Sequence, residues 1–519
     1  MKRTNTFFIM AALLLAGIST IVSCTKDDEQ PVEGKTYHMT VTASKGGDNT
    51  KDLTINGNTI SATWAVGETV TVYNVTKGAD LTGTLAAQSS GDNTTLKGDL
   101  TGTIEEGDEL LLKFCSPDYS MQQGTLAYIA SHCDYAEATV TVASVAGGEI
   151  TARGNAAFVN KQAIVKFSLM DSVSGTAINA SALSVSVGDT IYAAVPASAT
   201  NVLYVALPGI SGKAVTLSAK VGDQWYNKTQ ANVTFVNGQY YTVAAKLKPK
   251  GMLPGTFSVS DSKKVHFSQG NLQATYDGSS WTWAFADNQY GRAAGNTKVT
   301  ATSPYISGEG TVDLFGWVGG SSTFDGVAQY GITSSTATNN INGYGNNSTE
   351  NLKFDWGTLA IRNGGNTSNC GWHTLTGGYD ESAEWKYLFN SRSTSTSYAK
   401  AHLFCTTYGV ILFPDNYTHP TGVAAPTGVN ATGNTSWNAN TYTDVEWAKM
   451  EAAGAVFLPA AGYRHESSVR DLDYGYYWSS TTGNKNIART VHFRSGGLDP
   501  NSSSNRSYGC SVRLVCTVE

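Results

Sequence analysis

The polar residues near the C-terminus are spaced as a binding surface would require. Within residues 477–516, the apolar Val491 and Phe493 alternate with polar neighbours. Because successive side chains of a strand point to opposite faces, this period of two directs the apolar set into the core and the polar set outward. The polar set is rich in Tyr, Arg, Asn, Ser and Gly, which suit adaptable recognition surfaces. A solvated strand without a ligand is the alternative that composition alone favours. The residues expected to bind ligand are Asn484, Asn486, Arg489, Thr490, His492, Arg494, Gly497, Asp499, Ser502, Asn505, Ser507, Tyr508 and Cys510.

Catalytic and metal-binding patterns are weak in this chain. Cys510 and Cys516 are the candidate nucleophiles, but a reactive thiol needs an electropositive surrounding, and no base or metal pattern accompanies them. His465-Glu466 lacks the second histidine of a zinc-protease motif, and no Cys-x-x-Cys or Cys/His cluster indicates zinc. We therefore expect a protein that is not an enzyme and that holds no metal and no cofactor.

The cysteines do not define a disulfide pattern. Six of the seven follow Cys24, and an exported chain is permitted disulfides. Cys510 and Cys516 would lie roughly 20 Å apart on one extended strand, which is too far for a bridge. We expect these two cysteines not to pair with each other.

The N-terminus has the features of an export signal. Two basic residues precede an apolar run, residues 7–21, that is too short to span a membrane. The run leads into Ser23-Cys24, and a small residue directly before a cysteine at this place resembles a bacterial lipobox. The resemblance implies that residues 1–23 are a signal peptide and that the Cys24 thiol is lipidated. An ordinary secretory signal is the alternative. Residues 24–34 form an acidic tether that resembles surface-export signals of some Gram-negative lipoproteins, which implies a lipid-anchored, surface-exposed protein of the outer membrane.

Composition suits an all-β extracellular protein. The chain has 519 residues, which favours two to four domains, and 54 of them are glycine. Charged residues make up 15%, well below the usual quarter. A net charge of −6 gives no support for nucleic-acid binding.

A linker that contains proline and glycine, residues 248–254, separates two parts of the chain that differ in sequence pattern. Before it, short alternating strands divided by Gly, Asn and Asp predict two β-sandwich domains, residues 35–160 and 161–247. After it, residues 255–519 are rich in tryptophan. Tryptophans are more often core residues than sugar-stacking platforms, so we expect most of them to be buried.

Two helices are predicted in the tryptophan-rich half. Residues 381–390 place Trp385, Leu388 and Phe389 on one face. Thr443-Asp444-Val445-Glu446 has the pattern of a capping box, which predicts a helix that begins there and ends near Gly454.

Residues 35–247 resemble the fimbrillin family of pilins. The matching motifs are Trp64 with Gly67-Glu68-Thr69-Val70-Thr71-Val72-Tyr73, and the closing Gly238-Gln239-Tyr240-Tyr241-Thr242-Val243. The resemblance implies two β-sandwiches, a surface lipoprotein and strand exchange with other pilin subunits. Pilins of this family are commonly matured by cleavage at an arginine near the first strand. This chain departs from that pattern, because its first arginine after Cys24 is Arg153 and only Lys35 and Lys45 could substitute.

Residues 255–519 resemble a C-type-lectin-like domain of the kind found in variable proteins of diversity-generating retroelements. That family implies a constant framework whose outward positions are changed by adenine-directed mutagenesis. The calcium-binding motifs of sugar-binding C-type lectins are absent. The residues that carry the resemblance are Gly270-Asn271-Leu272, Asp313-Leu314-Phe315-Gly316-Trp317, Asp355-Trp356-Gly357, Phe457-Leu458-Pro459-Ala460-Ala461-Gly462-Tyr463-Arg464, Tyr477-Trp478-Ser479-Ser480 and Ser511-Val512-Arg513-Leu514-Val515.

Together these features predict a mainly β protein, with two fimbrillin-like β-sandwich domains followed by an α+β C-type-lectin-like domain. The expected function is a cell-surface lipoprotein adhesin, as a pilus-tip subunit, that binds an unknown protein or glycan. A non-polymerising lipid-anchored binder and a structural pilin without a specific ligand are the alternatives.

Overall fold

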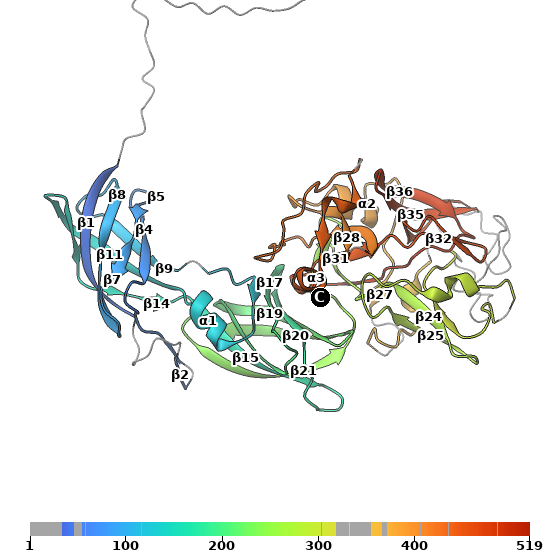
Figure 1. Ribbon diagram of the computed structural model, residues 1–519, viewed down its shortest axis with the longest axis horizontal. Coiled ribbons are helices and arrows are strands. Elements are labelled where there is room, and N and C mark those ends of the chain that lie inside the picture. The colour runs from blue at the N-terminus through green and yellow to red at the C-terminus, as the bar shows by residue number, and fades with distance from the viewer. Residues whose placement is uncertain are drawn as a thin grey trace, which may run out of the picture.

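The chain is mainly β and is arranged as three successive bodies (Figure 1). The computed structural model describes residues 34–518, except 46–53, 318–331, 333–353, 366–370 and the single residues 58, 116, 303, 405, 434 and 485. The predicted signal peptide, Cys24 and all of the predicted tether except Gly34 therefore lie outside the described residues. No helix among the described residues is long and apolar enough to cross a membrane.

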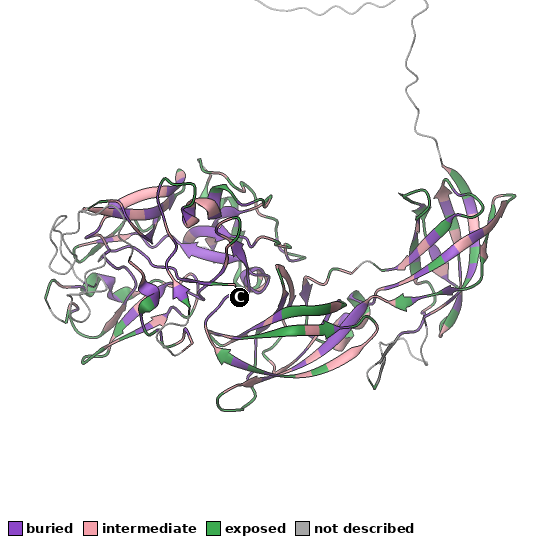
Figure 2. Cartoon of the chain, turned by 180° about the vertical axis from the view of Figure 1, so that it is seen from behind, coloured by how far each residue is buried: buried purple, intermediate pink, exposed green. Residues whose placement is uncertain are grey.

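The first body is a sheet that closes on itself. β1 pairs with β8 on one edge and with β12 and β13 on the other, so the circuit β1-β12-β11-β9-β4-β7-β8 has no end. Alternate residues of these strands are buried, as expected when one face of a sheet packs inward (Figure 2). The strands are β1 (Lys35–Ser44), β2 (Thr54–Asn56), β3 (Thr59–Ser61), β4 (Thr69–Asn74), β5 (Ala79–Asp80), β6 (Thr82–Gly83), β7 (Leu85–Ala87), β8 (Asn93–Gly102), β9 (Glu109–Phe114), β11 (Ala136–Ala146), β12 (Glu149–Arg153), β13 (Ala156–Ala157) and β14 (Val159–Asn160).

Lys45, one of the two substitute cleavage sites, is built into this body. Its side chain is 2% exposed, and its Nζ lies 3.0 Å from Glu68 Oε2 and 3.6 Å from Asp134 Oδ2. The ammonium also lies over the Trp64 and Phe114 rings. Because a protease needs an accessible extended segment, Lys45 is unavailable for cleavage in the folded domain, whereas Lys35 is exposed.

The second body is an eight-stranded sheet with the order β10-β17-β16-β19-β20-β21-β15-β18. The pairing of β20 with β21 is confined to Tyr226 with Pro249 and Asn227 with Lys248. Beyond these two pairs the strands diverge, and an apolar cavity of about 260 Å³ opens between them, lined in part by Phe167, Val215 and Phe235. The elements are β10 (Met121–Gln122), α1 (Leu126–His132), β15 (Gln162–Asp171), β16 (Ala182–Val187), β17 (Thr190–Ala194), β18 (Val202–Pro208), β19 (Ile210–Val221), β20 (Gln224–Phe235) and β21 (Tyr240–Pro249).

One segment of the first half crosses into the second body. After β9 the chain leaves the first sheet, pairs β10 with β17, and lays α1 beside β18 before it returns as β11. Ile129 and Cys133 pack on Ile164 and Ala206, and Gln122 hydrogen-bonds the backbone of Ala206 in both directions. The second body therefore includes a segment that lies, in the sequence, between two strands of the first body, and strand spacing does not indicate this arrangement.

The third body combines short sheets with α2 (Glu384–Asn390) and α3 (Asp444–Ala452). Both helices lie where the sequence predicts them. Trp385, Leu388 and Phe389 are buried, and Thr443 and Glu446 form the capping box. The sheets are β22-β23-β37-β27, β25-β24-β26, β30-β28-β29-β31, β32-β33 and β34-β35-β36. The strands are β22 (Phe257–Ser258), β23 (Lys264–Phe267), β24 (Leu272–Tyr276), β25 (Trp281–Phe285), β26 (Gly310–Val312), β27 (Trp372–His373), β28 (Tyr398–Leu403), β29 (Thr407–Leu412), β30 (Thr441–Tyr442), β31 (Val456–Pro459), β32 (Tyr463–His465), β33 (Ser468–Arg470), β34 (Gly475–Thr482), β35 (Ile487–Arg494), β36 (Gly497–Asn505) and β37 (Val515–Thr517); the 3-10 turns are Ala294–Lys298, Trp356–Thr358 and Trp437–Ala439.

The second and third bodies are joined through α3. Ser184 Oγ donates to the Ala452 carbonyl at 2.6 Å, and Lys220 Nζ lies 2.6 Å from Glu451 Oε2. The Glu451 side chain is 2% exposed, and its other oxygen accepts from Gln289 Nε2 at 3.0 Å. Glu451 is thus a buried charge whose partners come from both bodies.

Replacement of Glu451 tests this junction. Glu451→Ala leaves the Lys220 ammonium partly buried without its partner, so we expect a loss of about 3 kcal/mol in the free energy of unfolding, measured by urea denaturation. Glu381→Ala is the matched control, since its ion pair with Lys386 is 85% exposed on the glutamate side and should contribute about 0–1 kcal/mol. Equal losses in the two variants would show that the junction does not depend on Glu451.

Candidate functional site

Most of the predicted binding residues lie on β35 and β36 of a three-stranded sheet in the order β34-β35-β36. Five lie outside these strands, namely Asn484, Asn486, Ser507, Tyr508 and Cys510. The predicted alternation holds along β35, where Val491 and Phe493 are buried, His492 is half-buried and Arg494 is exposed. Asn484 and Asp499 are also exposed. The half-buried members of the set are Asn486, Arg489, Gly497, Ser502, Asn505 and Tyr508.

The predicted outward orientation is wrong for three of these residues, because Thr490, Ser507 and Cys510 are buried. The predicted alternation requires one free face of the sheet, whereas both faces are covered along much of their length. Val491 and Phe493 pack with the core around α2, and Ala488 packs on the other face with a core that includes Cys510. Thr490 lies on that second face and is 1% exposed.

Cys510 carries a buried thiol and does not belong to the surface of the sheet. Its backbone pairs with Phe315 in both directions, and its side chain is fully enclosed. Burial raises the pKa of the thiol far above its usual range, so the sulfur stays protonated and unreactive. As expected, Cys510 is not joined to Cys516.

The predicted set is also split between the two faces of the sheet. Arg489 and His492 are three residues apart on β35, so their side chains point to opposite faces. The Arg489 guanidinium lies 4.5 Å from the centre of the exposed Tyr379 ring and donates to Ser503 Oγ at 2.9 Å. Arg489 and His492 therefore cannot belong to one contact surface.

The His492 face carries a row of half-buried aromatic side chains, here named the aromatic row. His492 stacks on Tyr476 with ring centres 4.6 Å apart, and Tyr463 meets the edge of Tyr476 at 5.2 Å. Tyr508 stacks on Tyr463 at 4.9 Å and contacts His465 at 5.2 Å. The row consists of Tyr463, His465, Tyr474, Tyr476, His492 and Tyr508.

Strand pairing positions these rings side by side. Tyr476 on β34 lies directly opposite His492 on β35, which in turn lies opposite Asp499 on β36. A bridge between Gly462 and Gly475 brings Tyr463 beside Tyr476, and a bridge between Arg464 and Gly509 brings Tyr508 beside Tyr463. The row thus runs across the strands and draws on four separate stretches of sequence.

Sequence reasoning found two members of the row, His492 and Tyr508, and missed Tyr463, His465, Tyr474 and Tyr476. The alternation in Tyr474-Gly475-Tyr476-Tyr477 could have indicated Tyr474 and Tyr476, because Tyr477 is fully buried and its neighbours are not. Tyr463 and His465 join the row only through bridges between distant segments, which a single sequence does not display.

Charged groups flank the row. Arg494 lies over the Tyr474 ring and donates to its hydroxyl at 3.3 Å, and its side chain is exposed. Asp499 is exposed on the neighbouring strand, beside His492. Burial, and then the positive charge of Arg494, lower the pKa of His492, so the ring is neutral at pH 7 and can stack on Tyr476 without the cost of a buried charge.

This arrangement is suited to binding. No group of three or more His, Cys, Asp or Glu that could hold a metal ion occurs in the part of the chain that the structure describes. The tryptophans of this body are mostly core residues, with Trp317, Trp356, Trp385 and Trp478 fully buried and Trp281 half-buried. The half-buried aromatic row, rather than a tryptophan platform, is the aromatic surface on the His492 face of the sheet.

Comparisons with known proteins give limited matches. A family model described as a domain of unknown function, DUF8237, matches residues 432–515, which include the aromatic row. No curated protein matches the chain. A fimbrial assembly protein from Parabacteroides distasonis is 12% identical, with 45% of this chain and 96% of that chain covered and a TM-score of 0.23. The tip fimbrial protein Mfa3 from Porphyromonas gingivalis is 10% identical, with 41% and 95% covered and a TM-score of 0.22. The shaft pilin SpaA from Lactobacillus rhamnosus GG is 11% identical, with 42% and 100% covered and a TM-score of 0.20. Scores of this size do not assign a function.

The pKa of His492 gives a test of the site's electrostatics. Because the folded pKa lies below the unfolded value of about 6.5, the unfolded chain binds the proton more readily and stability falls as the pH drops below about 6.5. We expect NMR titration to place His492 below that value, and Arg494→Gln to raise its pKa part of the way back. Arg153→Gln, which changes an exposed arginine on β12 of the first body, is the control. A His492 that titrates at its ordinary value would contradict this account.

Proposed function

We propose that the protein is a cell-surface adhesin in which two β bodies carry a third, lectin-like body that binds its ligand through the aromatic row. The observation that carries the proposal is the row itself. Six half-buried rings are held in register by backbone pairing and are flanked by Arg494 and Asp499. Such a surface offers a large contact area at a small cost in conformational entropy.

A protein surface is the ligand class that the ring geometry favours. Tyr476 and His492 are within 14° of parallel, and Tyr463 and Tyr508 within 29°, so each of these rings covers one face of its neighbour. A sugar stacks on a free ring face, whereas covered rings present their edges and hydroxyls. Tyrosine and arginine presented in this way are typical of protein-binding surfaces.

The position of the row supports a role in recognition. The sheet that bears it belongs to the body at the opposite end of the molecule from the first β body (Figure 1). In the proposal, lipid on Cys24 anchors the N-terminus at the outer membrane and the two β bodies hold the third body away from it. The positions proposed to vary are then the exposed members of the His492 face, and the buried Thr490, Ser507 and Cys510 are excluded from that set.

Assembly with other pilin subunits is a second part of the proposal. Facing edges of β20 and β21 diverge beyond Asn227 and Lys248 around the apolar cavity of the second body. An extended segment from another subunit could pair with these edges, as the resemblance to fimbrillins implies. A pilin without a specific ligand is the competing function, and it makes no use of the aromatic row.

Two arginines on β35 give a matched test of the ligand-binding face. The lipid-free mature protein, residues 25–519, is screened on arrays of surface proteins and of glycans, and affinity for each bound component is measured by biolayer interferometry. We expect Arg494→Ala to weaken binding roughly 10-fold, and Tyr508→Ala by at least as much, because both remove contacts from the row. Arg489→Ala, on the opposite face, should bind as the unaltered protein does.

Three results would contradict this part of the proposal. They are equal losses for Arg489→Ala and Arg494→Ala, binding that survives deletion of residues 255–519, and a ligand found only on the glycan array, which would overturn the protein ligand class. Circular dichroism of each variant shows that the fold is retained.

The anchor and the assembly are tested in cells. Cys24→Ser removes the proposed lipid site, so we expect the protein to move from the outer-membrane fraction to a soluble fraction and to lose the mass of the lipid. Persistence of Cys24→Ser in the membrane fraction would exclude this anchor.

Electron microscopy of the unaltered cells is expected to show filaments that carry the protein. Labelled protein without filaments would identify the non-polymerising binder instead.

A further inference from the structure

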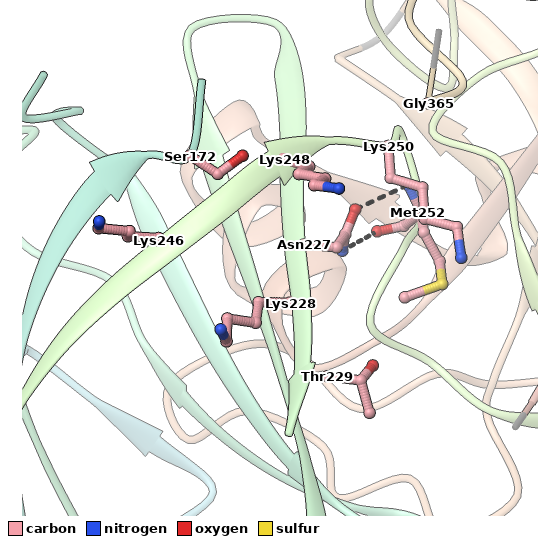
Figure 3. A pocket seen from close by; sticks show the side chains of 9 residues that line it. All are labelled: Ser172, Asn227, Lys228, Thr229, Lys246, Lys248, Lys250, Met252 and Gly365. Atoms are coloured by element: carbon pink, nitrogen blue, oxygen red, sulfur yellow. Dashed lines mark hydrogen bonds between the residues drawn. The ribbon is translucent and has the colours of Figure 1, made fainter. Parts of the chain in front are cut away.

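A second concave site lies where the second body meets the third. A pocket of about 500 Å³ is bordered by β20, by β21, by Met252 of the linker and by Gly365 of the third body (Figure 3). Four of its residues are lysines, namely Lys228, Lys246, Lys248 and Lys250. The site is separate from the aromatic row and goes beyond the proposed adhesin function.

These four lysines have no acidic partner among the residues that the structure describes. None of the ion pairs within the described part of the chain includes any of them. Asp171, next to the pocket residue Ser172, keeps its negative charge, since hydrogen bonds from the Ser174 and Val173 backbones to Oδ1 lower its pKa. Among the ion pairs of the described residues, none joins Asp171 to these lysines. Like charges gathered in a concave site produce a positive potential, and here they do so in a chain of net charge −6.

Lysines on an exposed strand often only prevent aggregation of the strand edge. Lys246 and Lys248 are exposed alternate residues of β21 and fit that account taken alone. The pocket adds two features that edge protection does not need. First, Lys228 comes from β20 and Lys250 from the linker, so the charges do not all lie on β21. Second, Asn227 fixes the wall of the pocket. Its side chain donates to the Met252 carbonyl at 2.8 Å and accepts from the Met252 N–H at 3.2 Å (Figure 3).

The chemistry of the wall indicates the ligand class. Ammonium groups on flexible stems meet anionic groups as point charges and do not require one planar geometry. Ser172 and Thr229 supply hydroxyls beside them, as a ligand with hydroxyl groups of its own would need. A volume of this size suits a ligand of one or two sugar rings. We propose that this pocket binds an acidic saccharide through its carboxylate or sulfate groups.

The test uses the mature protein and defined saccharides. Isothermal titration with a sulfated chondroitin disaccharide, a uronic-acid disaccharide without sulfate and a neutral disaccharide separates sulfate from carboxylate recognition. We expect binding of at least one acidic disaccharide and none of the neutral one. Lys228→Glu with Lys248→Glu should weaken it about 10-fold or more, and higher salt should weaken it too.

The matched control carries the same change of charge elsewhere. Lys97→Glu with Lys213→Glu alters two exposed lysines outside the pocket and should leave binding unchanged. Equal loss in both double variants would show a non-specific charge effect and overturn the site. The ligand class would be overturned if neither acidic disaccharide binds. It would also be overturned if polyglutamate or inorganic sulfate binds more tightly than the acidic disaccharides do. Retained binding to the ligand of the aromatic row in the Lys228→Glu/Lys248→Glu variant would show that the two sites are independent.

Discussion

The buried carboxylate of Glu451 organises the connection between the carrier bodies and the binding body. It accepts from Lys220 of the second body and from Gln289 of the third. Gln289 Oε1 in turn accepts from Arg513 at 2.8 Å and from the Phe457 backbone at 2.8 Å. The Arg513 guanidinium reaches Asn271, whose amide donates to the Tyr477 hydroxyl at 3.2 Å. The Tyr477 side chain is buried and does not reach the surface, but its neighbour Tyr476 is a member of the aromatic row.

A polar chain of this kind is expensive to bury unless every member is paired. Arg513 is fully enclosed, and burial lowers its pKa to about 10, which still leaves it charged at pH 7. Apolar packing alone would tolerate several rotations of the second body on α3, because apolar contacts have little directional preference. Hydrogen bonds that reach from Lys220 to Tyr477 permit few arrangements, so the sheet under the row and the second body are held in one relative orientation.

Local signals predicted local structure well and failed where distant segments meet. The capping box of α3 and the alternation around Val491 depend on near neighbours, and both are present in the structure. Thr490 and Cys510 were misplaced because the covering of the second face comes from segments far along the chain. Only two of the six members of the aromatic row were predicted for the same reason, since Tyr463 reaches the row through a bridge of Gly462 with Gly475. The lysine pocket also joins residues of two bodies, and the spacing of residues within one strand does not indicate such a pocket.

The excursion of residues 121–132 has a mechanical consequence. A chain of separate domains is usually joined by one linker, and each joint then bends and extends independently. Here the chain passes between the first and second bodies three times, between β9 and β10, between α1 and β11, and between β14 and β15. Tension applied between the N-terminus and the third body would be divided among three covalent connections, with Gln122 and Ile129 held against the second sheet. The first two bodies would therefore respond to pulling as one stiff rod rather than as beads on a flexible string.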